Sequence, residues 1–296
     1  MAINTSTFNL IETNQIQRVS TLVTESCANG NDPLVLFNIS DVCFQHIYTV
    51  QEDKWRSAMA TRVEQIFPDD SERAKKVICA CRSLVVNHLP QRHVDERTPQ
   101  VIADLQAQGV SVIGISGRSA RAAYALNGDN ALLTNKYLQS VGIDFSQSTF
   151  VQEASGKVIN EEGKPSFHHG ILFTAGKPSA EADLNNPSSS EVLQNFLTTI
   201  DSKAKSILVI NNSATSLRKM GEKLIQKGFE VTGVHYTATA ERKKAIDHSI
   251  GYIQFLQLAE KMDVSGDDVA TEMLMQNEDK EHYQKLFDDY IRNLEM

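Results

Sequence analysis

Residues 34–42 read Leu-Val-Leu-Phe-Asn-Ile-Ser-Asp-Val, an apolar run of strand length that ends in polar side chains. Four consecutive apolar residues indicate a strand buried on both faces, as in a parallel sheet covered by helices. The polar residues Asn38, Ser40 and Asp41 follow at the point where such a strand leaves the sheet. Ligand sites of open α/β sheets form at this carboxyl edge, so residues 38–41 are predicted to belong to one.

Strand-like and helix-like runs alternate on both sides of this stretch. Strands are predicted at 110–116, 171–173, 207–210 and 229–235, and helices at 14–28, 98–109, 119–126, 131–141 and 214–227. Thr13 and Thr98 are expected to cap the helices that follow them. This alternation is typical of an α/β fold, a Rossmann-like parallel sheet with helices on both faces.

Residues 44–92 interrupt the alternation, because they are predicted to be mostly helical. One helical face of this segment carries Trp55, Met59, Val63 and Ile66. We therefore expect an inserted helical cap over 44–92. The remaining domains are predicted as a core made of 1–43 and 93–260 and an acidic helical tail over 261–296.

Composition excludes several classes of protein. The 296 residues are 41% hydrophobic and 22% charged, as in an ordinary globular protein rather than a disordered or repetitive chain. With 29 Lys and Arg against 37 Asp and Glu, the formal charge of -8 disfavours nucleic acid and anionic lipid as partners. No apolar run approaches the about 18 residues of a membrane span, and the N-terminus lacks the pattern of a secretory signal.

Three predicted strands end in polar tips. The first tip is Asn38-Ile-Ser-Asp41, the second is Ser116-Gly117-Arg118, and the third is Asn211-Asn212. Since the carboxyl ends of parallel strands meet at one edge of a sheet, these tips are expected to lie together.

The ordered strands and tips resemble those of the haloacid dehalogenase (HAD) superfamily of phosphohydrolases, and more narrowly a HAD-like family of intracellular bacteria. Besides 34–42, the segments that carry the resemblance are 112–118, 137–145, 170–174, 207–212 and 233–237. It extends over about residues 14–258. The resemblance implies a HAD-like core and synthesis in a bacterial cytoplasm.

The departures from the family pattern concern its catalytic groups. The two aspartates of the first motif, nucleophile and general acid, are replaced by Asn38 and Ser40, which are poor substitutes in both roles. The late motif reads Asn211-Asn212 instead of the carboxylates that hold Mg²⁺. The position of the family's lysine is Ser189, although Lys177 in the preceding loop could reach the site. Asp41 is expected to point elsewhere.

These departures predict a catalytically degenerate HAD-like protein, a pseudophosphatase without a cofactor, that binds a protein partner or a phosphorylated ligand. The residues predicted to bind that ligand are Asn38, Asp41, Ser116, Gly117, Arg118 and Lys177. One alternative is a Mg²⁺-dependent phosphatase that uses Asp41 or Ser116. Another is a serine hydrolase, but Gly114-Ile-Ser-Gly-Arg118 departs from G-x-S-x-G at its fifth position.

Several motifs also have ordinary structural interpretations. Asparagine at a strand end suits a turn, and Ser188-Ser-Ser-Glu191 fits a capping box. His168-His169 is expected in a surface loop rather than in a metal site, and Cys79-Ala-Cys81 is expected to pack in a helix.

The end of the chain, residues 277–296, mixes acidic residues with apolar ones at helical spacing. One interpretation is a terminal amphipathic helix packed on the body of the protein. The other is an export signal, since its composition resembles that of type IV secretion effectors, which are delivered into a host cell.

Overall fold

The computed structural model describes residues 8–122, 128–154, 161, 164–176, 188–240, 247–277 and 281–294. The chain divides into two compact units. The first comprises the described parts of Met1–Gln45, His93–Ala122 and Asp129–Glu241, and the second those of His46–Arg92, Ala123–Gly128 and Arg242–Met296.

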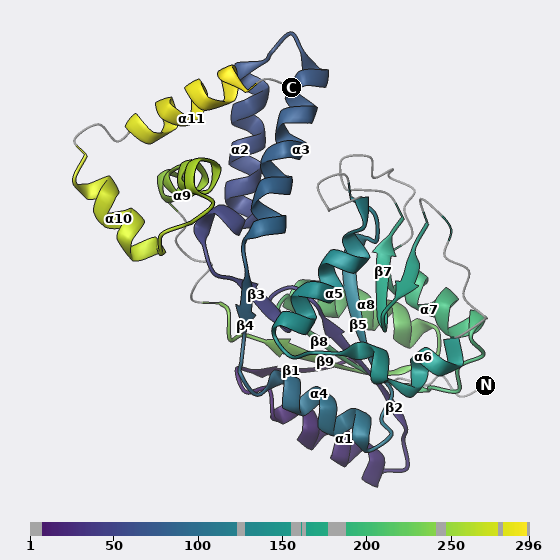
Figure 1. Ribbon diagram of the computed structural model, residues 1–296. Helices are drawn as coiled ribbons and strands as arrows, with labels where there is room; N and C mark the ends of the chain where they lie inside the picture. The colour runs from purple at the N-terminus through teal and green to yellow at the C-terminus, as the bar shows by residue number, and fades with distance from the viewer. Residues whose placement is uncertain are drawn as a thin grey trace. The chain divides into compact units, whose positions relative to one another are not determined.

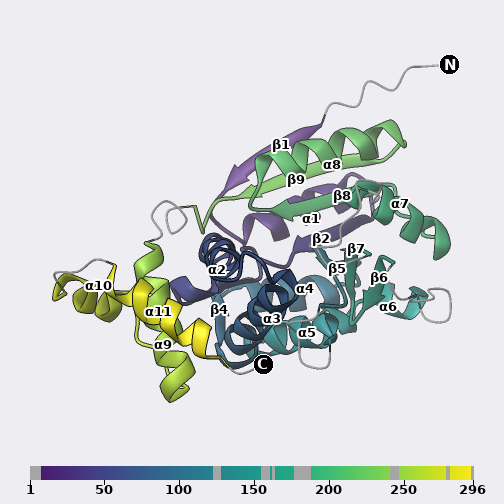
Figure 2. The same ribbon diagram turned by 90° about the horizontal axis from the view of Figure 1, so that it is seen from above.

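A seven-stranded sheet, counted over the described residues, forms the centre of the first unit (Figures 1 and 2). Its order is β1-β9-β8-β2-β5-β7-β6. The strands are β1 (Asn9–Thr13), β2 (Pro33–Asn38), β5 (Val112–Ser119), β6 (Ser166–His168), β7 (Ile171–Ala175), β8 (Ser206–Asn211) and β9 (Glu230–Tyr236). Neighbouring strands are parallel except β6, which pairs antiparallel with β7. The predicted Rossmann-like α/β fold is therefore confirmed.

Both faces of the central strand are buried, as its apolar run predicted. Leu34 to Phe37 are all 0% exposed. Val35 and Phe37 face an apolar cluster with α1 (Arg18–Ala28), α4 (Thr98–Ala107) and α5 (Asn130–Ser140). Leu34 and Leu36 face a second cluster with α6 (Thr149–Ala154), α7 (Ser189–Thr199) and α8 (Ala214–Gln226). Helices therefore cover both faces, and a short 3₁₀ turn (Phe145–Gln147) precedes α6.

Several local predictions were wrong. Thr13 does not cap a helix but ends β1, a strand that the sequence did not predict, and its hydroxyl accepts a hydrogen bond from the backbone N–H of Gln15. Thr98 is the first residue of α4 rather than its cap, and its buried hydroxyl has no hydrogen-bond partner among the described residues. β5 continues to Ser119 and residues 120–122 are not helical, so the predicted helix at 119–126 is absent there; 123–126 lie outside the described residues.

The second unit is helical. It contains a 3₁₀ turn (Thr49–Gln51), α2 (Asp53–Ile66), α3 (Ser71–His88), α9 (His248–Lys261), α10 (Asp267–Met275) and α11 (His282–Asn293). Trp55 is 0% exposed and stacks on Phe255 of α9, with ring centroids 5.9 Å apart. Phe287 of α11 packs edge-on against Phe255. This unit therefore combines the 44–92 segment with α9, which we had expected in the core, and with the helices of the acidic tail.

A buried polar network connects three elements of this unit. Gln254 of α9 is 0% exposed, and its side-chain oxygen accepts a hydrogen bond from the Val50 N–H at 3.0 Å. Its amide donates to Asp267 at 2.8 Å, and Asp267 also accepts from the backbone N–H of Thr49. A buried amide with these partners avoids the cost of an unsatisfied polar group and fixes the start of α10.

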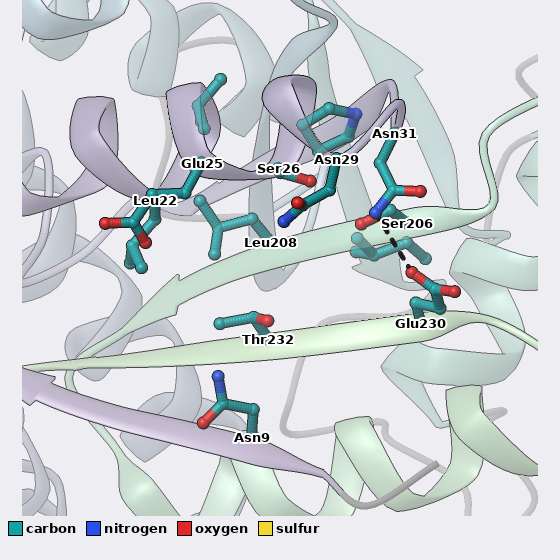
Figure 3. Close-up of a pocket in the computed structure, with 13 residues that line it drawn as sticks. Asn9, Leu22, Glu25, Ser26, Asn29, Asn31, Ser206, Leu208, Glu230 and Thr232 are labelled. Carbon is teal, nitrogen blue, oxygen red and sulfur yellow. Dashed lines mark hydrogen bonds between the residues drawn. The ribbon is translucent and has the colours of Figure 1, made fainter.

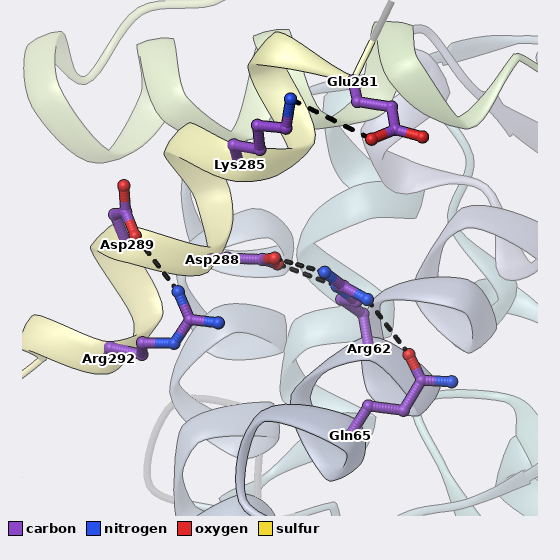
Figure 4. Close-up of polar contacts among 7 residues, drawn as sticks. All are labelled: Arg62, Gln65, Glu281, Lys285, Asp288, Asp289 and Arg292. Atoms are coloured by element: carbon purple, nitrogen blue, oxygen red, sulfur yellow. Dashed lines mark hydrogen bonds and ion pairs between the residues drawn. The ribbon is translucent and has the colours of Figure 1, made fainter.

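The last helix is an integral part of this unit. Phe287 and Ile291 of α11 are 0% exposed. Asp288 beside them is buried and accepts two hydrogen bonds from the Arg62 guanidinium of α2, one of them 2.9 Å long (Figure 4). This pairing raises the pKa of Arg62. The interpretation of the tail as a packed amphipathic helix is confirmed for residues 282–293.

The boundary between the units falls within a separate two-stranded sheet of β3 (Phe44–His46) and β4 (Gln91–His93).

The helices in the described part of the chain are all too short or too polar to cross a membrane.

Candidate functional site

The strand register brings the predicted polar tips to one edge of the sheet. Phe37 of β2 pairs with Ile210 of β8, so Asn38 and Asn211, the residues that follow them, lie level on neighbouring strands. On the other side of β2, Asn38 pairs with Ile115, the residue before Ser116. The first strands to either side of β2 therefore present their tips beside Asn38, at the carboxyl edge where ligand sites of this architecture form.

Asp41 is held at the first tip in an unusual backbone conformation. Its φ angle is 65°, in the left-handed region, and its backbone N–H donates to Phe44 O at 2.8 Å. Aspartate is among the few residues other than glycine that tolerate this region. Its carboxylate accepts a hydrogen bond from the side-chain amide of Asn212 at 3.2 Å. Asp41 thus faces the third tip, contrary to our expectation that it points elsewhere.

Asn38 and Asn211 have turn-forming roles. The Asn38 amide donates to Ser40 O at 2.7 Å, and the Asn211 side-chain oxygen accepts from the Ser213 N–H at 2.9 Å. Ser213 in turn caps α8 by accepting from the N–H of Ser216. These contacts agree with the structural interpretation of asparagine at strand ends.

Ser116, Thr174 and Ser189 form a chain of contacts across β5, β7 and α7. Ser116 is buried, and its hydroxyl accepts from the Arg118 N–H at 3.2 Å. Thr174 donates its hydroxyl proton to Ser116 O at 3.2 Å and contacts the Ser189 hydroxyl at 2.9 Å. Because Thr174 has one hydroxyl proton, Ser189 is then the donor to Thr174.

The other predicted ligand-binding residues are Gly117, Arg118 and Lys177. Gly117 is exposed, and a side chain added there would meet no atom within 4 Å. Arg118 is half-buried beside it. Lys177 lies outside the described residues. Ser189, at the predicted position of the family's lysine, does lie beside the strand tips.

Two helices begin at this edge. α8 follows the tip of β8 directly, and α7 begins where Ser189 meets Thr174 of β7. Free N–H groups and the helix dipole make such N-termini favourable for anions. In α7 a carboxylate already occupies this position, since Ser188 N–H donates to Glu191 at 2.7 Å and lowers the pKa of Glu191. The first turn of α8 contains no acidic residue.

Thr174 and Ser213 are the site residues that the sequence did not identify. Thr174 ends the segment 170–174, which contributed to the resemblance, but its side-chain contacts depend on where α7 begins. Ser213 directly follows Asn211-Asn212, so an N-cap at the start of the predicted helix 214–227 was the available signal.

Of the other motifs, the capping box has its predicted role and the two cysteines lie in a helix, whereas His168, expected in a surface loop, lies in strand β6. Ser188 and Glu191 form the capping box of α7. His168 ends β6, and His169 and Gly170 form the turn to β7 with positive φ angles. Cys81 is buried within α3, and burial raises its pKa to about 12. Among the described residues, no three His, Cys, Asp or Glu side chains are grouped so that they could hold a metal ion.

The chemistry available at the carboxyl edge follows from its groups. Amides, hydroxyls and backbone N–H groups can donate hydrogen bonds to an anion. Asp41 is the carboxylate among the three predicted tips, and it is engaged by Asn212. The residue at the end of β2 is the amide Asn38, a very poor nucleophile toward phosphorus.

The comparison with known proteins gives a family. No curated protein and no solved structure matches the chain. Residues 12–268, which include every predicted tip, match a family described as "Protein of unknown function (DUF2608)". The chain belongs to the DUF2608 family.

Proposed function

We propose that the carboxyl edge of the first unit binds a phosphorylated ligand and does not hydrolyse it. The observation that carries the proposal is the meeting of Ser116, the start of α8 and the strand-end amides of Asn38 and Asn211 at one edge. These groups offer hydrogen-bond donors and a helix N-terminus to an anion, and few negative charges oppose it.

The proposal treats the unit as a degenerate HAD-like domain. Its support is topological: the chain leaves β2 toward β5 and β7 on one side, then crosses to β8 and β9 on the other. Doubly wound sheets bind ligands at such a reversal of strand order, which here lies beside β2. The tips of the three strands at this reversal are the segments that resemble the superfamily's motifs.

The absence of turnover follows from the replaced groups. Asn38 and Ser40 supply neither a nucleophile nor a general acid, and Asn211 and Asn212 are weak ligands for Mg²⁺. Groups that act as one catalytic unit lose activity by orders of magnitude when one is removed. The protein then acts by binding, as a pseudophosphatase.

A phosphatase is the second candidate, and the position of Asp41 favours it. Its carboxylate accepts a hydrogen bond from Asn212 at the tip of β8, so it lies at the candidate site. In this alternative Asp41 or Ser116 takes part in hydrolysis and Mg²⁺ is required. Dependence of turnover on Mg²⁺ distinguishes the two candidates.

The nature of the partner follows from charge. The net charge of -8 supports a protein or a phosphorylated small molecule over nucleic acid. Delivery of the chain into a host cell by a type IV secretion system remains a prediction that rests on tail composition. Since α11 is packed into the second unit, a translocation reporter fused to the whole chain, with and without residues 277–296, is the appropriate test.

Titration with orthophosphate tests the binding proposal. We expect saturable binding in the absence of Mg²⁺, followed by backbone NMR shifts at residues 116–118 and 213–215. Ser116→Ala should weaken binding severalfold, because a donor to a charged oxygen is lost. Ser140→Ala, which removes an exposed hydroxyl on α5, is the matched control. No binding at millimolar phosphate, or equal binding by both variants, would contradict the proposal.

A further inference from the structure

A pocket lies at the amino edge of the sheet, opposite the candidate functional site. It has a volume of about 250 Å³ and is enclosed by the end of α1 and the beginnings of β8, β9 and β1 (Figure 3). Val23 and Leu208, which are buried in the same apolar cluster, form the floor. Because the strands begin here, the pocket is separate from the candidate site at their carboxyl ends.

The lining of this pocket is acidic. Of the described residues that line it, two are glutamates, Glu25 and Glu230, and none is Lys, Arg or His. Figure 3 shows these two glutamates on opposite sides of the pocket. Asn31 closes the Glu230 side by donating to its carboxylate at 3.3 Å. The lining therefore carries a formal charge of -2 with the two charges separated.

The end of α1 adds to this negative potential. Gly30, with φ 79°, donates to Cys27 O at 2.9 Å, and Asn31 N–H donates to Ser26 O at 3.2 Å, a Schellman arrangement that ends the helix at the pocket. The carboxyl end of a helix dipole favours cations, yet the last turn of α1 contains no basic residue.

We infer that this pocket binds a small aliphatic diamine, with one ammonium group at each glutamate and the carbon chain over the apolar floor. The volume lies just below the about 300–1,000 Å³ of pockets for drug-sized molecules, which fits a short chain. Amide and hydroxyl oxygens from Asn9, Asn29 and Thr232 are the further acceptors for the ammonium protons.

One residue of the chain competes with this ligand. Arg18, two turns earlier on the same face of α1, contacts the Glu25 carboxylate at 3.3 Å. The guanidinium offsets the charge of Glu25, so the Glu230 side is expected to contribute more to binding. Removal of Arg18 should therefore strengthen diamine binding, whereas removal of either glutamate should weaken it.

Calorimetric titration of the full chain with 1,4-diaminobutane tests the inference, with 1,4-butanediol as the uncharged analogue of the same length. We expect binding of the diamine alone, and weaker binding at higher salt. Glu230→Gln should reduce affinity about two- to fivefold, as expected for a partly exposed ion pair, and Arg18→Gln should raise it. Glu222→Gln, an exposed glutamate of α8 that does not line the pocket, should change nothing.

Backbone NMR shifts locate the ligand. Shifts at residues 26–31 and 230–232 that saturate with the calorimetric curve support the inference. It is overturned if the diamine fails to bind at tens of millimolar, if the diol binds as well as the diamine, or if Glu230→Gln binds like Glu222→Gln. Phosphate binding at the carboxyl edge is measured separately, so failure at one site leaves the other result unaffected.

Discussion

The side-chain amide of Asn212 donates a hydrogen bond of 3.2 Å to the carboxylate of Asp41. The contact joins the tips of β8 and β2 through two residues that lie 171 positions apart in the sequence. It fixes an acidic side chain against a neutral one at the carboxyl edge. The two strand tips are therefore held together by an amide–carboxylate pair.

Asn212→Asp tests this pair. The substitution places a second carboxylate against Asp41 and removes the amide donor, so one carboxyl group must keep its proton or the two repel. We expect the free energy of unfolding at pH 7 to fall by about 1–3 kcal/mol, and Mg²⁺ to restore part of it. Urea titrations followed by far-UV circular dichroism measure both effects. Asn195→Asp, at an exposed position on α7, is the control and should remain insensitive to Mg²⁺.

The buried pair of Arg62 and Asp288 is predicted to stabilise the second unit strongly. Arg62→Met leaves the Asp288 carboxylate buried without its guanidinium and should cost about 3–5 kcal/mol. The double variant Arg62→Met with Asp288→Leu should recover most of that loss, since an apolar pair replaces the ion pair. Trp55 is the single tryptophan of the chain and is buried in this unit, so its fluorescence reports unfolding there.

The exposed pair of Asp289 and Arg292 on α11 provides the control. These side chains lie 3.1 Å apart, and both are more than half exposed. Arg292→Met should therefore change stability by less than about 1 kcal/mol. Equal losses for Arg62→Met and Arg292→Met would show that burial of Asp288 has no energetic consequence.

The ion pair of Asp95 and Arg97 should make the stability of the first unit depend on pH. Arg97 donates two hydrogen bonds of 2.9 Å to its carboxylate, which lowers the pKa of Asp95. A lowered pKa in the folded state gives stability that is present above the unfolded value of about 3.9 and is lost as the pH falls through the folded value. Arg97→Gln should thus lower the urea midpoint at pH 7, and its difference from wild type should shrink below about pH 4. Lys203→Gln, from the exposed pair with Asp201, should show a smaller effect at pH 7.

Gly251 of α9 packs directly against Trp55. A Cβ atom at this position would lie 2.0 Å from the indole ring, which is fully buried and has no room to move. Gly to Ala inside a helix ordinarily gains about 0.5–1 kcal/mol, but here we expect a loss of about 1–3 kcal/mol. Denaturant unfolding measures whether Gly251→Ala is more or less stable than the wild type. Combination with Trp55→Phe, which shortens the ring system, should recover part of the loss; a gain from Gly251→Ala alone would contradict this packing.

The sequence predicted the sheet well for physical reasons that can be named. The continuous apolar run Leu34 to Phe37 indicated a strand that is buried on both faces. The polar residues that follow the apolar strands indicated which strand ends meet at the carboxyl edge. β1 was not predicted because its five residues, Asn9 to Thr13, mix polar and apolar side chains. It is an edge strand that pairs only with β9.

Side-chain contacts of the site were less predictable. That Asp41 faces Asn212 depends on its left-handed backbone, and that Ser189 meets Thr174 depends on the exact start of α7. The sequence likewise did not indicate which residues pack against α9. Its packing against Trp55 places it in the second unit.

Hydrolysis of a panel of phosphate esters, including a phosphotyrosine peptide, with and without Mg²⁺, tests the central claim most directly. The wild type should release no phosphate under either condition. A folded variant with Asn38, Ser40, Asn211 and Asn212 all changed to Asp is measured beside it. Any Mg²⁺-dependent turnover by this variant would show that the carboxyl edge can still position a phosphate ester. Mg²⁺-dependent turnover by the wild type, abolished by Asn38→Ala or Ser116→Ala, would contradict the account and establish a phosphatase.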